Sequence, residues 1–487
     1  MTSPAEQNST NPPKRVSTAK IVGYALGEGA VSITMNGVSN FGMLYYTLVL
    51  GLGAGYVGIA LSVTTLWDAI TDPIMGYLTD NTRSRFGRRF PYILLGGLVL
   101  AISFYMLWVL PGKFVSASSI FWCVLLTNLV VRTCVTIFVV PYTALGFEIC
   151  PEYVDRARLQ GIRYFLNQIV NLVFGAFAWM MFFQDRDAPD GTRIDGTTFA
   201  SNYIDMATTL SVAALLLVLL CIYSIREFAK DNRSSAPFGQ GISSFRDTMV
   251  EIFTDRLAWF VFAFLGMSKL AMLFVAQIQI FVYVLYMQFS AVEKTVVHGG
   301  TMISFAIGAL MLSRLVRKYD KKKTAYIGIW ISTIGSVGLL AVFSGGFLLP
   351  DAVWTIAQHE LPIGRMIFAP LHWMWWGGCG ILVPLATSMI ADVSEVNMKK
   401  TGVLKDGSYA AVFSFIAKTA NSVGLLMTGA LIAWAGVVAG SGEQTPESVQ
   451  NVAWMTFLSG PIILIFCIWI LQKYPVDKAF MSPGSRT

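Results

Sequence analysis

The sequence predicts an all-α membrane protein whose twelve spans form two six-helix bundles. Composition is the first reason: of 487 residues, 55% are hydrophobic and 13% are charged, whereas soluble domains carry about 25% charged residues. The second reason is that the apolar residues gather in runs long enough to cross a bilayer. The third is that basic residues are concentrated in alternate loops, as expected when loops alternate between two compartments.

Each span is predicted from a run of about 20 mostly apolar residues. The predicted spans are 20–49, 54–78, 91–111, 118–148, 160–184, 203–224, 257–289, 296–316, 323–346, 366–392, 408–436 and 452–472. Several of these runs exceed the minimum, so we expect tilted helices or helices that extend beyond the bilayer.

The basic residues predict the orientation of the chain. They precede the first span or follow the even-numbered ones, as in the cluster after the second span: Arg83, Arg85, Arg88 and Arg89. The opposite loops are poor in base, and 185–202 is mostly acidic. The positive-inside rule therefore predicts that both termini are cytoplasmic. We expect a multi-pass protein of the inner or plasma membrane.

The longest basic loop divides the chain into two halves of six spans each. The predicted parts are a cytoplasmic tail at 1–19, a bundle at 20–224, a cytoplasmic loop at 225–256, a second bundle at 257–472 and a cytoplasmic tail at 473–487. This layout resembles that of major facilitator proteins, whose halves are related by an axis along the membrane normal. We expect them to rock between inward-open and outward-open states.

Several classes of function are disfavoured. The six cysteines are scattered singly and the three histidines lie far apart in sequence, so no metal motif or disulfide framework is visible. No nucleophile–base pair or phosphate loop is visible either, which leaves a polytopic enzyme or receptor as a remote alternative. The net charge of +7 is ascribed to topology, not to nucleic-acid binding. We expect no cofactor and a functional monomer.

The second span carries two carboxylates in an otherwise apolar setting. Charged groups in a membrane are costly, so they indicate function by default. Asp68 and Asp72 are four residues apart and lie on one helical face. Two such anions repel, and either a proton or a bound cation relieves that repulsion. The alternative is structural pairing with a basic residue of a neighbouring span.

Lys418 in the eleventh span is the candidate partner of these aspartates. If the three share a cavity, two negative charges face one positive charge, and a sodium ion or a proton would complete the balance. Four other charges lie inside predicted spans. Arg163 is a candidate for a bidentate hydrogen bond to a sugar or carboxylate, or for snorkelling to the interface. Glu28 is a candidate ligand or a partner of Lys20 or Arg163, while Arg132 and Lys269 have no assigned partner.

Four segments carry a resemblance to a known family. They are WDAITDPIMGYLTDNTRSRFGRRFP at 67–91, YALGEG at 24–29, VPYTALGFEICPEYVDRARLQGIR at 140–163 and SMIADVSEV at 388–396. In this order, with Lys418 downstream, they resemble the glycoside–pentoside–hexuronide:cation symporters, the family of the melibiose permease. The resemblance covers essentially the whole chain and implies cation-coupled symport of a sugar or glycoside.

The resemblance also implies roles for particular residues. The two aspartates of the second span would bind the coupling sodium or proton, and Thr71 beside them is a candidate neutral ligand. Lys418 and Arg163 would belong to the same site region. Tyr142 and Thr143 are candidates for further neutral oxygens.

The chain departs from the melibiose-type pattern at three positions. Ser32 stands where an aspartate of the first span would hold the sugar, and Val139 stands in place of another aspartate. Thr143 replaces a tryptophan. A galactoside is therefore disfavoured, and a cation-coupled carrier of a lysolipid or other amphiphile is the alternative. Polar residues inside spans are candidates for hydroxyl recognition: Asn36, Asn40, Asn167, Asn171, Gln277 and Gln279.

The basic loop after the second span is similar to the loop motif of facilitator proteins. The resemblance predicts a cytoplasmic gate in which Asp80 and the arginines, among them Arg88, pair across the halves. Asp392 and Glu395 at the inner end of the tenth span could pair with Arg156 or Arg158. Ion pairs near water contribute only about 0–1 kcal/mol each, which suits a gate that opens in every cycle. The alternative is a basic loop that sets topology alone.

Overall fold

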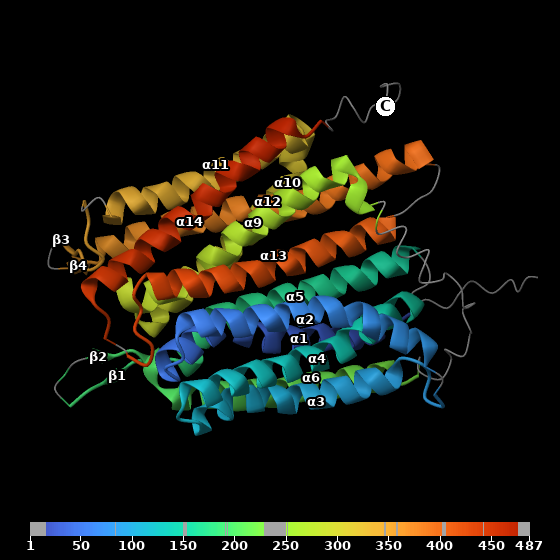
Figure 1. Ribbon diagram of the computed structural model, residues 1–487, viewed down its shortest axis with the longest axis horizontal. Coiled ribbons are helices and arrows are strands. Elements are labelled where there is room, and N and C mark those ends of the chain that lie inside the picture. Colours follow the sequence, from blue (N-terminus) through green and yellow to red (C-terminus); the bar gives the residue numbers. More distant parts are fainter. Residues whose placement is uncertain are drawn as a thin grey trace, which may run out of the picture.

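The computed structural model describes residues 16–475, except 83, 150–152, 190, 192, 228–249, 251, 345–346, 357–358, 402–405 and 442. Within these residues the chain is almost entirely helical, which confirms the all-α prediction (Figure 1). Twelve long helices are described. The first half contains α1 (Thr18–Leu44), α2 (Ala54–Asn81), α3 (Phe90–Val109), α4 (Ala117–Ile149), α5 (Tyr153–Phe182) and α6 (Ala200–Ile225). The second half contains α9 (Arg256–Phe281), α10 (Ala291–Tyr319), α11 (Lys321–Leu339), α12 (Ile363–Thr401), α13 (Asp406–Trp434) and α14 (Pro446–Lys473).

Local sequence explains where several of these helices begin. Ser17 caps α1, and Thr445 caps α14 just before Pro446. A full capping box starts α10, because Ser290 and Glu293 each accept a hydrogen bond from the other's backbone N–H. Prolines inside α2, α4, α12 and α14 are compatible with membrane helices, where neighbouring groups satisfy the freed backbone carbonyls.

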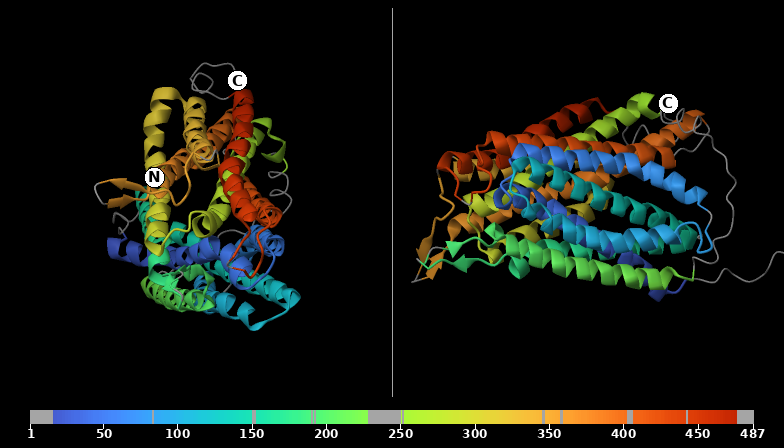
Figure 2. Two further views of the ribbon diagram at one scale, coloured as in Figure 1. Left: turned by 90° about the vertical axis from the view of Figure 1, so that its left-hand side faces the viewer. Right: turned by 60° about the horizontal axis from the view of Figure 1, so that its bottom comes forward.

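The two halves repeat the same plan. The first helix of each half, α1 or α9, ends in a π-helical turn: η1 (Tyr45–Val49) and η4 (Val282–Tyr286). Within the halves, α1 packs on α6 and α3 on α4, as α9 packs on α14 and α11 on α12. Between the halves, α2 packs against α13 and α5 against α10. Figure 2 shows the first half on one side of the molecule and the second half on the other.

The two ends of the molecule differ. One end, here called the hairpin end, carries two short antiparallel hairpins: β1 (Arg186–Asp187) with β2 (Arg193–Ile194), and β3 (Trp354–Ile356) with β4 (His359–Leu361) (Figure 1). Three further short elements are η2 (Pro111–Lys113), η3 (Gly196–Thr198) and η5 (Leu340–Ser344). The opposite end, here called the basic end, carries the 84–89 loop and the start of α11 with Lys321 and Lys322.

The bundles are joined tightly toward the hairpin end. A Cβ added at Gly58 of α2 would lie 2.9 Å from the Cα of Gly429 of α13, so glycine permits this contact. The N–H of Gly440 donates to the carbonyl of Thr47 in the other half at 2.9 Å. One apolar core cluster here contains residues of both bundles, whereas the other two clusters each lie within one bundle. This conformation is therefore closed at the hairpin end.

Nine helices in the described ranges are long and apolar enough to cross a membrane. The three long helices that fall outside this set are α1, α2 and α5. They carry Glu28, Asp68, Asp72 and Arg163, together with several asparagines. In α1 and α2 these polar residues lower the hydropathy of the helix.

Candidate functional site

The two carboxylates of α2 meet at a hydroxyl of α4. Asp68 and Asp72 lie one turn apart, and their Oδ1 atoms are each 3.0 Å from Oγ1 of Thr136. One hydroxyl hydrogen is therefore shared between two carboxylates, which holds them on the same side of α2. Thr136 lies four residues after Arg132 on α4, so the two side chains lie on one face of α4 and both reach α2.

Lys418 of α13 reaches these carboxylates from the other bundle. Its Nζ lies 3.3 Å from Oδ2 of Asp68 and makes an ion pair with Asp72. The structure thus brings together the three residues that the sequence analysis placed in one cavity. The cluster is only partly dry, because the side chain of Lys418 is 26% exposed and that of Asp72 is 35% exposed.

Arg132 changes the charge count that the sequence suggested. Its Nη1 lies 3.6 Å from Oδ2 of Asp68, so two cations face two anions. The expected shortfall of one positive charge is therefore absent in this conformation. The sequence left Arg132 without a partner because sequence spacing cannot show which face of α4 packs on α2.

Thr71 lies beside the cluster and does not reach the carboxylate oxygens through its hydroxyl. Its Oγ1 donates to the backbone carbonyl of Trp67 at 3.0 Å and lies 3.4 Å from Oγ1 of Thr136. Thr136 is thus the better placed neutral oxygen, and the sequence analysis missed it. Thr136 is one of several threonines in α4, and the sequence does not show which of them faces α2.

A second charged cluster joins α1 to α5. The guanidinium of Arg163 donates to Oε2 of Glu28 through Nε at 3.1 Å and Nη2 at 2.5 Å. It also lies over the ring of Tyr142, 4.9 Å from the centroid, and 3.4 Å from the hydroxyl of Thr143. Arg163 is buried, so it pairs with Glu28 and does not snorkel. Tyr142 is fully buried, and its hydroxyl donates to the carbonyl of Tyr24, so its role here is to support the arginine.

A line of neutral polar groups continues this cluster toward the hairpin end. Asn36 donates to Asn171 at 2.5 Å, Asn171 donates to Asn167 at 2.9 Å, and Asn167 donates to Ser32 at 2.6 Å. On α1, Glu28, Ser32 and Asn36 are spaced by four, as are Arg163, Asn167 and Asn171 on α5. We call these six residues the α1–α5 polar stripe. Gln277 of α9 approaches α1 separately, donating to the carbonyl of Ser39 at 3.1 Å.

Three residues of the predicted gate, Asp392, Glu395 and Arg158, lie at the basic end and are bonded within their own halves. Asp392 pairs with Lys321 at 2.6 Å, Glu395 pairs with Lys399 at 3.0 Å, and Arg158 bonds Thr18. Arg88 lies in the 84–89 loop. The side chains of Asp80 and Arg156 lie outside the described residues. Pairing across the bundles at this end therefore stays a prediction.

The hairpin end contains an ion pair that the sequence analysis missed. Lys294 of α10 is fully buried and pairs with Asp195, which precedes η3 in the other half. The predicted eighth span began at residue 296, so Lys294 was counted with the loop. Only the packing of α10 on α5 brings it inside.

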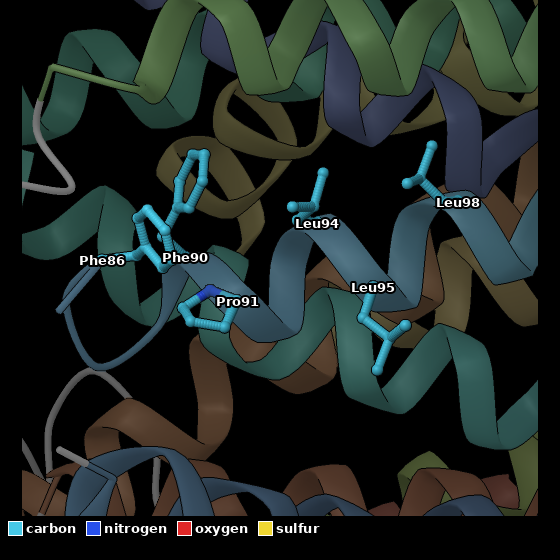
Figure 3. Close-up of a pocket in the computed structure, with 6 residues that line it drawn as sticks. All are labelled: Phe86, Phe90, Pro91, Leu94, Leu95 and Leu98. Carbon is cyan, nitrogen blue, oxygen red and sulfur yellow. The ribbon is translucent and has the colours of Figure 1, made fainter. Parts of the chain in front are cut away.

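A groove on α3 is not part of the site. It has a volume of about 350 Å³ and is apolar throughout, so it offers no hydrogen-bonding side chain to a polar solute (Figure 3). Its lining residues are Phe86, Phe90, Pro91, Leu94, Leu95 and Leu98.

Comparison with known proteins agrees with this geometry. The family described as MFS/sugar transport protein matches residues 23–478, nearly the whole chain. The chain belongs to this family. It is therefore a multi-pass membrane transporter, and the remote alternative of an enzyme or receptor is set aside. The predicted resemblance to glycoside–pentoside–hexuronide:cation symporters is confirmed at the level of the family.

Two relatives of this MFS/sugar transport protein match nearly its whole length, and a third matches a part of it. The inner membrane symporter YicJ of Escherichia coli K12 is 25% identical over 470 residues, covering 96% of this chain and 92% of the relative. The glucuronide carrier protein homolog of the same organism is 24% identical and covers 96% of this chain and 94% of the relative. The sodium-dependent lysophosphatidylcholine symporter 1 of Gallus gallus is 33% identical, over 29% of this chain and 27% of its own.

Solved structures agree on the fold. The crystal structure of a D-xylose-proton symporter superposes with a TM-score of 0.59 at 12% identity, covering 94% of this chain and 96% of that one. At this identity the likeness supports the major facilitator fold alone.

Proposed function

We propose that this transporter couples a cation, sodium or a proton, to the symport of a sugar or glycoside by alternating access. The observation that carries the proposal is the convergence of Asp68 and Asp72 of the first bundle on Lys418 of the second. Relatives named as symporters and as a glucuronide carrier protein homolog support it.

Charge balance suggests how the ion is coupled to movement. With Lys418 and Arg132 in place, the two aspartates are already neutralised, so an added cation would be in excess. A coupling ion must therefore displace the Lys418 ammonium. Because Lys418 belongs to α13 and the aspartates to α2, this exchange releases a contact between the bundles. Ion binding and bundle movement are linked in this way.

The α1–α5 polar stripe is the candidate substrate surface. Asparagine amides offer both donors and acceptors, and the Arg163 guanidinium offers a planar set of donors, so the stripe suits a ligand with several hydroxyl groups. Ser32 stands in the stripe where melibiose-type members carry a carboxylate. Here the asparagine amides next to Ser32 take the place of that carboxylate in binding the sugar. This difference favours a sugar other than a galactoside.

The orientation follows from the basic residues. We place the protein in the inner or plasma membrane, with the basic end and both termini in the cytoplasm. We take the monomer as the functional unit. The hairpin end is then the outer side of the transporter, and it is closed in this conformation. Lys294 and Asp195 close the outer side.

A carrier of amphiphiles is the second candidate. The local identity of 33% with a lysophosphatidylcholine symporter favours it as an alternative. Its substrate would need an apolar path along the bundle, whereas the stripe between α1 and α5 is polar.

Uptake into proteoliposomes tests both candidates. Radiolabelled pentosides, hexosides and hexuronides, together with lysophosphatidylcholine, are offered with a sodium gradient, with a proton gradient and with neither. The proposal expects gradient-dependent accumulation of at least one glycoside. Accumulation of the lysolipid alone would contradict it and favour the second candidate.

A further inference from the structure

His298 of α10 is a buried titratable residue with no role in the proposed symport site. The residue is 3% exposed, and neither Nδ1 nor Nε2 has a hydrogen-bond partner among the described residues. Buried polar groups are nearly always paired, because leaving one unpaired costs free energy. An unpaired imidazole inside a membrane protein therefore indicates a function that needs it free.

The imidazole lies at the contact between the two bundles. A Cβ added at Gly175 of α5 would lie 3.6 Å from both Cδ2 and Nε2 of His298, so the ring rests against the backbone of α5. The ring of Trp179, one turn further along α5, meets it edge-on with 6.4 Å between centroids. Separation of α5 from α10 at the hairpin end would therefore uncover His298 directly.

Lys294 lies one turn before His298 on the same face of α10. Its ammonium is fully buried, pairs with Asp195, and lies 5.6 Å from the centroid of the Trp179 ring. Asp195 is held in place by the backbone N–H of Thr197 at 2.9 Å and by its hydroxyl at 2.8 Å. Lys294 and His298 thus both lie against the indole of Trp179, and Asp195 is paired with Lys294.

The other charged and titratable groups around His298 add no spare negative charge. The ring of Tyr283 in η4 meets it at 6.3 Å, and the hydroxyl of Tyr283 lies 2.9 Å from Nε2 of His372 in α12. At the start of α10, Glu293 is paired with Arg365 at 2.7 Å. Both ion pairs are neutral overall. A proton on His298 would therefore add an uncompensated positive charge one turn from Lys294.

We propose that His298 is a proton-binding switch that controls opening of the hairpin end. Neutral His298 is compatible with α5 packed on α10, whereas imidazolium at this position repels Lys294 and favours separation of the bundles. When the hairpin end opens, His298 is hydrated and takes one proton from the compartment that this end faces. Closing returns that proton to the same compartment. The open state binds more protons, so falling pH favours it. This switch is distinct from the Asp68–Asp72 site and does not depend on the substrate carried.

Hydrogen–deuterium exchange of the full-length protein in lipid nanodiscs tests the switch without any substrate. Peptides covering 193–199 and 291–302 report opening at the hairpin end. A hydrated imidazole has a pKa near about 6.5, so lowering the pH from about 8 to about 5.5 should raise the opening equilibrium about tenfold. The exchange of these peptides, corrected for the intrinsic effect of pH, should rise by that factor. His298→Gln, which cannot be protonated, should show no such rise.

His372→Gln is the matched control, because His372 is also buried but bonds to Tyr283 and Gln279 within one bundle. It should keep the tenfold response. Absence of a pH response in the parent protein would overturn the proposal, and this result needs no variant to fold. An equal response in His298→Gln would also overturn it, because the pH dependence would then belong to a group other than His298.

Discussion

Among the described residues, two lysines form ion pairs across the bundles, and these ion pairs differ in their access to water. At the hairpin end Lys294 is fully buried and its partner Asp195 is 19% exposed. In the middle of the molecule Lys418 is 26% exposed and Asp72 is 35% exposed. The first contact is a single pair between two elements, whereas the second joins three helices through two aspartates, Thr136 and two cations.

This difference assigns different tasks to the two contacts. Breaking a buried ion pair by removal of one partner costs about 3–5 kcal/mol, because it leaves an unpaired charge in a dry place. A hydrated pair contributes only about 0–1 kcal/mol, so another ion can replace the lysine. We infer that Lys294 and Asp195 hold the bundles together, while Lys418 gives way to the coupling ion.

The largest expected effect follows from removal of either charge at the hydrated cluster. Asp68→Asn and Asp72→Asn should each lower gradient-driven accumulation of substrate by at least about tenfold, because coupling needs both carboxylates. Exchange of substrate across the membrane should persist in part. Proteoliposome uptake and counterflow measure the two activities. Asp205→Asn, at an exposed carboxylate of α6, is the control. Unchanged accumulation in both cluster variants would rule out the cation site.

The next largest effect concerns stability at the hairpin end. Lys294→Met should lower the free energy of unfolding by about 3–5 kcal/mol, because it leaves Asp195 without its cation. The double variant Lys294→Met with Asp195→Asn should recover part of that loss. Thermal unfolding in detergent measures both. A single variant as stable as the parent would contradict the assignment of this pair as the closing contact.

A smaller effect on stability is expected from removal of the ion pair between Lys418 and Asp72. A double-mutant cycle with Lys418→Ala and Asp72→Asn should give a coupling energy of about 1 kcal/mol, because both side chains are partly hydrated. The corresponding cycle at Lys294 and Asp195 should give a larger value. Equal coupling energies at the two places would remove the basis of the comparison.

The smallest effect is expected at the basic end. Lys20 pairs with Glu227 on the surface, and the Lys20 ammonium lowers the pKa of that carboxyl. A lowered pKa stabilises the folded state above the usual titration range of glutamate and loses that effect as the pH falls. Because water and salt screen the pair, Glu227→Gln should leave the melting temperature unchanged at neutral pH. A clear drop in melting temperature would contradict this expectation and show that the surface pair stabilises the folded state appreciably.

The sequence was sufficient to predict the helical architecture and the two aspartates, because hydropathy and a spacing of four are local signals. It could also propose Lys418, since a lysine inside an apolar span needs a partner. It could not identify Thr136 or the partner of Arg132, because the rotation of α4 against α2 is set by packing. The sequence does not identify Lys294 as buried, because a charged residue near the end of a predicted span looks the same as a loop residue. Its burial depends on the neighbouring bundle.

Competition between Lys418 and the coupling ion is the central claim, and cation affinity tests it most directly. Thermal stability of the purified protein is titrated with sodium chloride against choline chloride at alkaline pH, and with pH in the absence of sodium. Parent and Lys418→Met are compared, with Lys399→Met as a control at a lysine of the basic end. We expect Lys418→Met to bind sodium at least about tenfold more tightly, or to take up its proton at a pH higher by at least about one unit. Equal or weaker cation binding in Lys418→Met would contradict the account.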